Sequence, residues 1–112
     1  RRPDIFLSIG QNSFSNPTAS GTEIYYYRGD SQGEKLSKLI MENVSNSLNL
    51  KDRGVRTAEF YLLREVKASA VILQLLYISN PQDEKLLSDK NFREAAAAAI
   101  FGAIAAYYKR LP

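Results

Sequence analysis

The stretch that decides the fold is residues 70–80, Ala-Val-Ile-Leu-Gln-Leu-Leu-Tyr-Ile-Ser-Asn. Such an almost continuous apolar run is typical of a strand in the middle of a sheet, and we expect a strand over Ala70–Ile78. Gln74 interrupts this run, and a polar side chain there costs about 1–3 kcal/mol unless it is hydrogen-bonded. Core packing does not require this glutamine. Gln74 is therefore a candidate functional residue.

Three other segments are expected to be strands: Asp4–Ile9, Glu23–Arg28 and Phe60–Leu63. The first carries apolar residues on both faces, as a strand covered on both sides would, and a polar loop follows it. The second contains three consecutive tyrosines, residues 25–27. We interpret this triplet as half core and half exposed sheet face, and the alternative is a platform on which sugar rings stack.

Amphipathic segments between the strands predict helices over Ser31–Leu48, Gln82–Leu87 and Asp89–Lys109. Asp30 or Ser31 can cap the first helix, and residues 49–54 end it. Asn80 followed by Pro81 is a typical start of the second helix. We therefore predict an α/β fold, a mostly parallel sheet flanked by helices, in which Asp4–Ile9 and Ala70–Ile78 lie near the middle.

Composition is consistent with one small globular unit of 112 residues. The net charge of +3 comes from interspersed basic and acidic residues, which indicates a solvated surface and no nucleic-acid partner. Without cysteine, disulfides and thiolate metal sites are excluded. The longest uncharged apolar run, Ala95–Tyr108, is shorter than the roughly 20 residues that span a bilayer, so no membrane span is expected.

Five motifs along the chain together resemble those of one protein family. The first is residues 4–13, Asp-Ile-Phe-Leu-Ser-Ile-Gly-Gln-Asn-Ser, and the others are Gly21 to Tyr27, Asp52 to Val55, Phe60 to Arg64, and Ile78 to Pro81. In this order they are similar to the motifs of the zinc-dependent N-acetylmuramoyl-L-alanine amidases of bacterial cell walls (amidase type 3), whose counterpart of residues 4–13 is D-I-F-I-S-I-H-A-N-S. The resemblance implies the second half of a three-layer amidase domain, with residues 1–112 as its C-terminal segment.

The resemblance also implies that catalytic groups have been replaced. Gly10 occupies the position of a zinc-binding His in the family, and Gln74 occupies that of the catalytic Glu. Glycine has no donor atom, and glutamine does not ionise near neutral pH, so it cannot act as a general base. The chain contains no His. We therefore expect no cofactor in this chain, although the family uses zinc, and no hydrolysis of the amide between N-acetylmuramic acid and L-alanine.

Three other residues are candidates for substrate binding. Asn12 follows a strand end in the family's active-site loop, where its amide could orient a peptide or brace the loop. Glu23 is either a buried functional carboxylate or a plain surface residue. Arg64 either lines a groove or pairs with Glu65 or Asp52. A serine hydrolase is excluded because no His accompanies the serines.

Several functional readings remain open at this point. The chain is either an inactive peptidoglycan amidase-like domain that still recognises glycan or stem peptide, or a scaffold or regulatory module with the amidase fold, or an altered or partial version of an active enzyme. The resemblance places it in the bacterial cell envelope. Because the family's first half would precede Arg1, we expect an unpaired strand edge at Asp4–Ile9 that binds this missing half or a second copy.

Overall fold

The computed structural model describes residues 5–65 and 68–110, apart from the side chain of Leu62. Its four strands form one sheet: β1 (Ile5–Asn12), β2 (Thr22–Tyr27), β3 (Asp52–Ala58) and β4 (Ser69–Tyr77). Their order is β1-β4-β2-β3, in which β1 pairs parallel with β4, β2 pairs parallel with β3, and β2 runs antiparallel to β4. The predicted mixed α/β fold is confirmed, and β4 lies inside the sheet.

Within the described residues, four helices accompany the sheet: α1 (Ser31–Leu48), α2 (Tyr61–Glu65), α3 (Pro81–Ser88) and α4 (Lys90–Lys109). The expected helix bounds are confirmed to within one or two residues. Asp30 caps α1 by accepting from the backbone N–H of Gly33 at 2.9 Å. Asn80 caps α3 with Pro81 in the first turn, and Asp89 caps α4.

One predicted strand is wrong, because Phe60–Leu63 falls mostly within α2. A strand would place the side chains of Tyr61 and Leu63 on the same face, yet Tyr61 is 71% exposed and Leu63 only 3%. An apolar run of four residues is too short for its period to distinguish strand from helix. The sequence pattern also missed β3, whose polar sequence and half-exposed edge position leave no alternating apolar signal.

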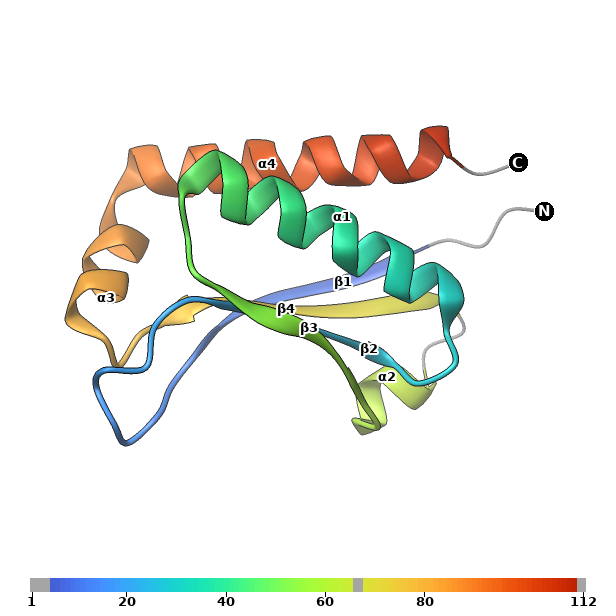
Figure 1. Ribbon diagram of the computed structural model, residues 1–112, viewed down its shortest axis with the longest axis horizontal. Coiled ribbons are helices and arrows are strands. Elements are labelled where there is room, and N and C mark those ends of the chain that lie inside the picture. Colours follow the sequence, from blue (N-terminus) through green and yellow to red (C-terminus); the bar gives the residue numbers. More distant parts are fainter. Residues whose placement is uncertain (1–4, 66–67, 111–112) are drawn as a thin grey trace.

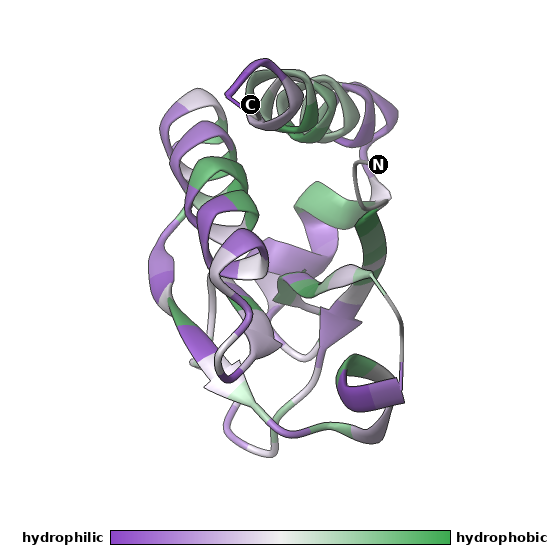
Figure 2. Ribbon diagram, turned by 90° about the vertical axis from the view of Figure 1, so that its right-hand side faces the viewer, coloured by the Kyte–Doolittle hydropathy of each residue, from purple (hydrophilic) through white to green (hydrophobic). Residues whose placement is uncertain are grey.

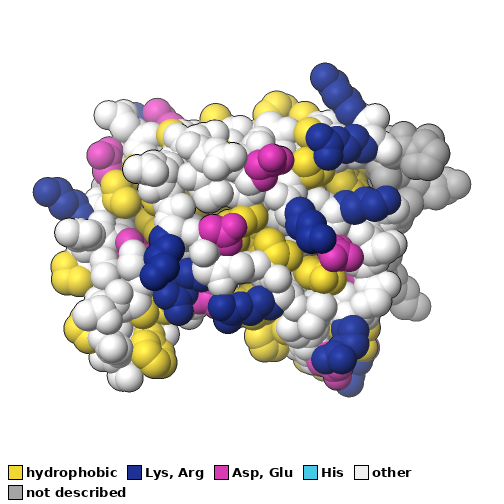
Figure 3. Space-filling model, viewed as in Figure 1, with side chains coloured by type: hydrophobic (Ala, Val, Ile, Leu, Met, Phe, Trp, Pro, Cys, Tyr) yellow, Lys and Arg dark blue, Asp and Glu magenta, His cyan; other side chains and the backbone are white. Residues whose placement is uncertain are grey.

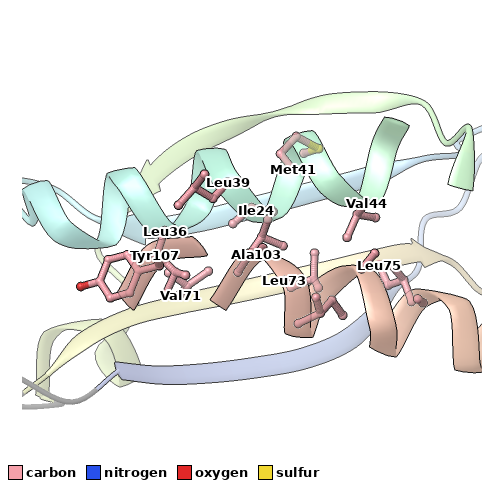
Figure 4. Packing of buried hydrophobic residues seen from close by; sticks show 14 of the residues in the cluster. Ile24, Leu36, Leu39, Met41, Val44, Val71, Leu73, Leu75, Ala103 and Tyr107 are labelled. Atoms are coloured by element: carbon pink, nitrogen blue, oxygen red, sulfur yellow. The ribbon is translucent and has the colours of Figure 1, made fainter. Parts of the chain in front are cut away.

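The core lies between the sheet and the pair α1 and α4, which both cover the same sheet face (Figure 1). Ile24, Val71 and Leu73 point from the strands into this layer, and α1 contributes Leu36 and Val44 among others (Figure 4). Figure 2 shows the hydrophobic side of α1 turned inward and its hydrophilic side turned to solvent. The buried residues of α4 are Ala96, Ala99, Ile100, Ala103 and Tyr107. Its small side chains let the helix approach closely.

The opposite face of the sheet carries only the short helix α2 among the described residues (Figure 1). The expected cover on both sides of β1 is therefore absent there, and Phe6 of β1, whose side chain lies on this face, is 39% exposed. Ile9 lies on the helix face as the register partner of Leu73, and it is 54% exposed at the outer edge of the sheet. β1 lies at an edge of the four-stranded sheet, so its predicted place near the middle is wrong. The edge position agrees with the unpaired edge that was expected for this strand. A strand paired on one side only leaves backbone donors and acceptors free on the other.

Candidate functional site

Three strands place Gly10, Gln74 and Glu23 side by side across the sheet. Gly10 of β1 is the register partner of Gln74 of β4, and Gln74 is in turn the partner of Glu23 of β2. Register partners share a face of the sheet. Since Ile24 and Leu73 point to the helices, this Gly10–Gln74–Glu23 row lies on the other face.

Space is available at the Gly10 end of the row. A Cβ built on Gly10 would meet only the Oε1 atom of Gln74, at 3.7 Å, which is an ordinary van der Waals distance. Gly10 is also absent from the residues with positive φ, so its backbone is open to other amino acids. The Oε1 atom of Gln74 is buried and has no hydrogen-bond partner among the described residues. At this end of the row, an acceptor without a partner, Gln74 Oε1, therefore lies beside Gly10, which has no side chain.

The Glu23 end of the row is densely bonded, and Glu23 is only 3% exposed. Its carboxylate accepts hydrogen bonds from the hydroxyls of Tyr77 and Tyr25, the latter at 2.6 Å. Asn12 Nδ2 donates at 3.1 Å and Arg53 Nε at 3.3 Å, both to Oε1. These bonds connect β1, β3 and β4 to β2. Glu23 is therefore buried and not a plain surface residue, and its role in binding a substrate stays a prediction.

Electrostatics favour the ionised form of Glu23. Burial by itself would raise the pKa of this carboxyl group, but hydrogen bonds from Tyr25 and Tyr77 and the charges of Arg53 and Arg56 together lower its pKa below the ordinary 4.5. The same burial and the adjacent carboxylate raise the pKa of Tyr25 to about 12 and also raise that of Tyr77. Both tyrosines are therefore neutral hydrogen-bond donors at pH 7.

The structure joins one of the other candidates to this site and leaves the second apart. Asn12 bonds to Glu23 and its Oδ1 accepts from the backbone of Ser13 at 2.9 Å, so it braces the loop after β1. Arg64 pairs with Glu65 at 2.9 Å on α2, and its guanidinium carbon lies 5.4 Å from the ring centroid of Tyr61. The described residues show no bond from Arg64 to the row. Its groove-lining role stays a prediction.

Sequence reasoning missed several residues that hold the site in place. Asp83, only 4% exposed, accepts from Ser20 Oγ at 2.8 Å and from the backbone of Gly21 and Tyr77 at 3.1 and 3.0 Å. It thus ties α3 to the start of β2 and the end of β4. Arg53 lies within the Asp52 to Val55 motif, and its guanidinium carbon lies 5.1 Å from the Tyr77 ring centroid. The motif is the only signal that singled out Arg53.

The residues of the row do not fit a zinc ion. Structural and catalytic zinc sites use at least three protein ligands from His, Cys, Asp and Glu, and no group of three such residues occurs within residues 5–65 and 68–110. Glu23 is the one carboxylate of the row, and its oxygens already accept hydrogen bonds from Asn12, Tyr25, Arg53 and Tyr77. Arg56 adds an ion pair at 3.7 Å. A cation would have to displace these partners.

Comparison with known proteins defines the class. The family model for N-acetylmuramoyl-L-alanine amidase matches residues 1–106. The chain is 31% identical over 109 residues to N-acetylmuramoyl-L-alanine amidase LytC of Bacillus subtilis, covering 95% of this chain and 22% of that protein. A cell wall amidase of Bacillus anthracis is 35% identical over 114 residues, covering 95% of this chain and 21% of that protein.

Solved structures agree with this result. The catalytic domain of the amidase CwlV from Bacillus (Paenibacillus) polymyxa superposes with a TM-score of 0.85 at 32% identity, covering 94% of this chain and 57% of that one. For amidase AmiC2 of Nostoc punctiforme the TM-score is 0.88 at 30% identity, with 95% and 58% covered. The chain belongs to the N-acetylmuramoyl-L-alanine amidase family. It spans about a fifth of these two curated relatives and somewhat more than half of the two solved chains.

Proposed function

We propose that this chain is a peptidoglycan-binding member of the amidase family that recognises the amide of the stem peptide without hydrolysing it. The Gly10–Gln74–Glu23 row carries this proposal, because it has an acceptor without a partner, Gln74 Oε1, beside a position without a side chain, while the groups that the resemblance leads us to expect for hydrolysis are replaced. Family membership supports peptidoglycan as the substrate class. The relatives named cell wall amidases support a location in the bacterial cell envelope.

The side chains of the row account for binding without cleavage. Hydrolysis of an amide needs an activated water and a group that takes its proton. The neutral amide of Gln74 does not take this proton, and Gly10 offers no ligand for a metal that would acidify the water. Gln74 Oε1 can instead accept a hydrogen bond from a substrate N–H. Glu23 remains ionised and saturated with partners, so it serves as the brace of the site.

We also propose that the free edge of β1 pairs with another strand, supplied by the rest of an amidase domain in another segment or chain. The exposed side chains of Phe6 and Ile9 and the uncovered sheet face support this proposal. A second copy of the chain is the other occupant that the free edge allows. Measurement of molecular size in dilute buffer distinguishes the two occupants. A dimer whose amount depends on protein concentration supports pairing with a second copy, and a stable monomer contradicts self-association.

The competing proposal is a scaffold that uses the amidase fold to hold a protein partner. The uncovered sheet face and the edge of β1 favour it, because both leave apolar surface open. In that case the row is a relic, and its side chains are not needed for binding to the cell wall. Substitution of Gln74 separates the two proposals.

Co-sedimentation with purified peptidoglycan, together with release of stem peptides, tests the proposed function. We expect binding without release, and we expect Gln74→Ala to weaken binding. The matched control is Gln11→Ala, since Gln11 is an exposed glutamine of β1 next to Gly10. Equal binding by both variants favours the scaffold. Stem-peptide release above the blank, or stoichiometric zinc by elemental analysis, contradicts the proposal of a non-hydrolytic site.

A further inference from the structure

A cavity of about 730 Å³ lies between α1 and α4, on the helical side of the sheet, and we call it the α1–α4 cavity. Its size is within the range of small-molecule sites in proteins, about 300–1,000 Å³. The cavity is separate from the Gly10–Gln74–Glu23 row, which lies on the opposite sheet face. A ligand in the cavity is therefore independent of the proposed function of the row.

The cavity lies at the end of the helix pair where α1 begins. Figure 1 shows α1 and α4 close together where α1 ends and farther apart where α1 begins. Asn43 contacts α4 at the close end, where its Nδ2 donates to the Ala99 carbonyl at 3.2 Å. At the open end Tyr107 fills the layer, with its ring beside Leu36 (Figure 4). The cavity is thus bounded by a bulky aromatic side chain on α4.

The lining combines apolar surface with positive charge. Leu39 and Tyr107 supply apolar surface, and Lys35 and Arg110 form no ion pair with any residue in the described part of the chain. Lys38 also lines the cavity, but Glu34 neutralises it at 2.9 Å. Figure 3 shows Lys and Arg side chains around hydrophobic atoms on this face. Among the described residues Glu42 is the one acidic residue of the lining, so the balance of charge favours a negatively charged ligand.

One lining residue also has an acceptor without a partner. Gln32 Oε1 is buried and has no hydrogen-bond partner among the described residues. The hydroxyl of Tyr107, a residue only 2% exposed, lies beside Ser69, whose hydroxyl donates to Asp30 Oδ1 at 3.2 Å and can still accept from Tyr107. Buried polar atoms without partners are destabilising, so a ligand that bonds to them gains affinity.

We propose that the α1–α4 cavity binds a small organic anion. Its apolar body contacts Leu39 and the ring of Tyr107, its negative group lies near Lys35 and Arg110, and a hydroxyl or N–H group donates to Gln32 Oε1. Carboxylates and phosphate esters share this chemistry. The buried acceptor of Gln32, which has no partner among the described residues, distinguishes the site from a surface that carries positive charge alone.

The experiment is a fluorescence titration of the whole chain with anilinonaphthalene sulfonate, an aromatic anion. Reversing both free charges, Lys35→Glu with Arg110→Glu, is expected to raise the dissociation constant at least about tenfold. The matched control is Lys51→Glu with Lys85→Glu, which makes the same change in net charge at exposed lysines outside the cavity lining. In this control the dissociation constant should change by no more than about twofold. Phenyl phosphate and benzoate as competitors distinguish the two sources of the anion.

A second measurement locates the bound probe. In proton–nitrogen correlation spectra the side-chain amide signals of Gln32 should shift on titration, while those of Gln11, which is outside the cavity lining, should not. Equal losses of affinity in the two double variants would overturn the proposal, because they would show only an effect of net charge. Unchanged Gln32 signals at saturating dye would overturn it too.

Discussion

The two ends of the Gly10–Gln74–Glu23 row are built in opposite ways. Glu23 accepts hydrogen bonds from four side chains on four strands, whereas the Oε1 atom of the adjacent Gln74 has no partner among the described residues. Both side chains face the same side of the sheet and lie one strand apart. The difference shows that the fold concentrates its polar contacts on one carboxylate. The other end of the row keeps an acceptor without a partner among the described residues, which the proposed binding of an amide N–H requires.

The largest effect is expected from Glu23→Gln. The substitution removes a buried charge and leaves Arg53 without its carboxylate, so the free energy of unfolding should fall by about 3 kcal/mol. Urea denaturation followed by circular dichroism measures this change. The control is Arg56→Gln, since Arg56 is 54% exposed and lies 3.7 Å from Glu23, and about 1 kcal/mol or less is expected for it. Similar losses in both variants would contradict the central position of Glu23.

A smaller effect is expected from Gln74→Glu. This change places a second carboxylate opposite Glu23, and like charges across a strand pair raise the pKa of one of them and cost about 1–2 kcal/mol at pH 7. The variant should recover part of its stability at pH 5, in contrast to the unchanged chain. It should not release stem peptide, because no ligand at Gly10 activates a water. Measurable amide cleavage by this variant would reveal a catalytic group outside the row.

The pH dependence of stability also tests the difference between the Glu23 end and the Gln74 end of the row. The pKa of Glu23 in the folded state lies below the ordinary 4.5. The contribution of Glu23 to the free energy of unfolding is therefore complete above about pH 4.5, and it is lost as the pH falls through the lowered pKa. Thermal unfolding between pH 6 and pH 3 should therefore show a decrease at the acidic end. Glu23→Gln should show a shallower decrease, and identical slopes for the two proteins would contradict the assigned pKa direction.

The smallest effect is expected from Gly10→Ala. A Cβ there meets only Gln74 Oε1 at 3.7 Å, and alanine restricts the unfolded chain, so stability should rise by about 0.4–1 kcal/mol. Gly21→Ala is the contrasting control, since its φ is 114° and its Cβ would lie 2.7 Å from the carbonyl oxygen of Lys51. Denaturant midpoints measure both. A loss of stability in Gly10→Ala would show that the space beside Gln74 is needed by the fold itself.

The sequence by itself determined the elements with a long or capped pattern. Ala70–Ile78 was recognisable as an interior strand because it is apolar except at Gln74. The helices α1 and α4 were recognisable because their apolar stripes are long and their starts carry Asp30 and Asp89. Through the family resemblance it also predicts that Gly10 and Gln74 stand in the positions of a zinc ligand and a catalytic base. These conclusions depend on residue identity and local spacing, which a sequence contains directly.

Only the tertiary structure decided the short elements and the contacts between strands. Residues 60–63 are too few to show a period, so packing against β2 and β4 set them as the start of α2. The hydrogen-bond partners of Glu23 lie up to 54 positions from it in the chain, and Asp83 accepts from Ser20, which is 63 positions away. Such contacts follow from strand order and register, because pairing across the sheet is set by the whole fold.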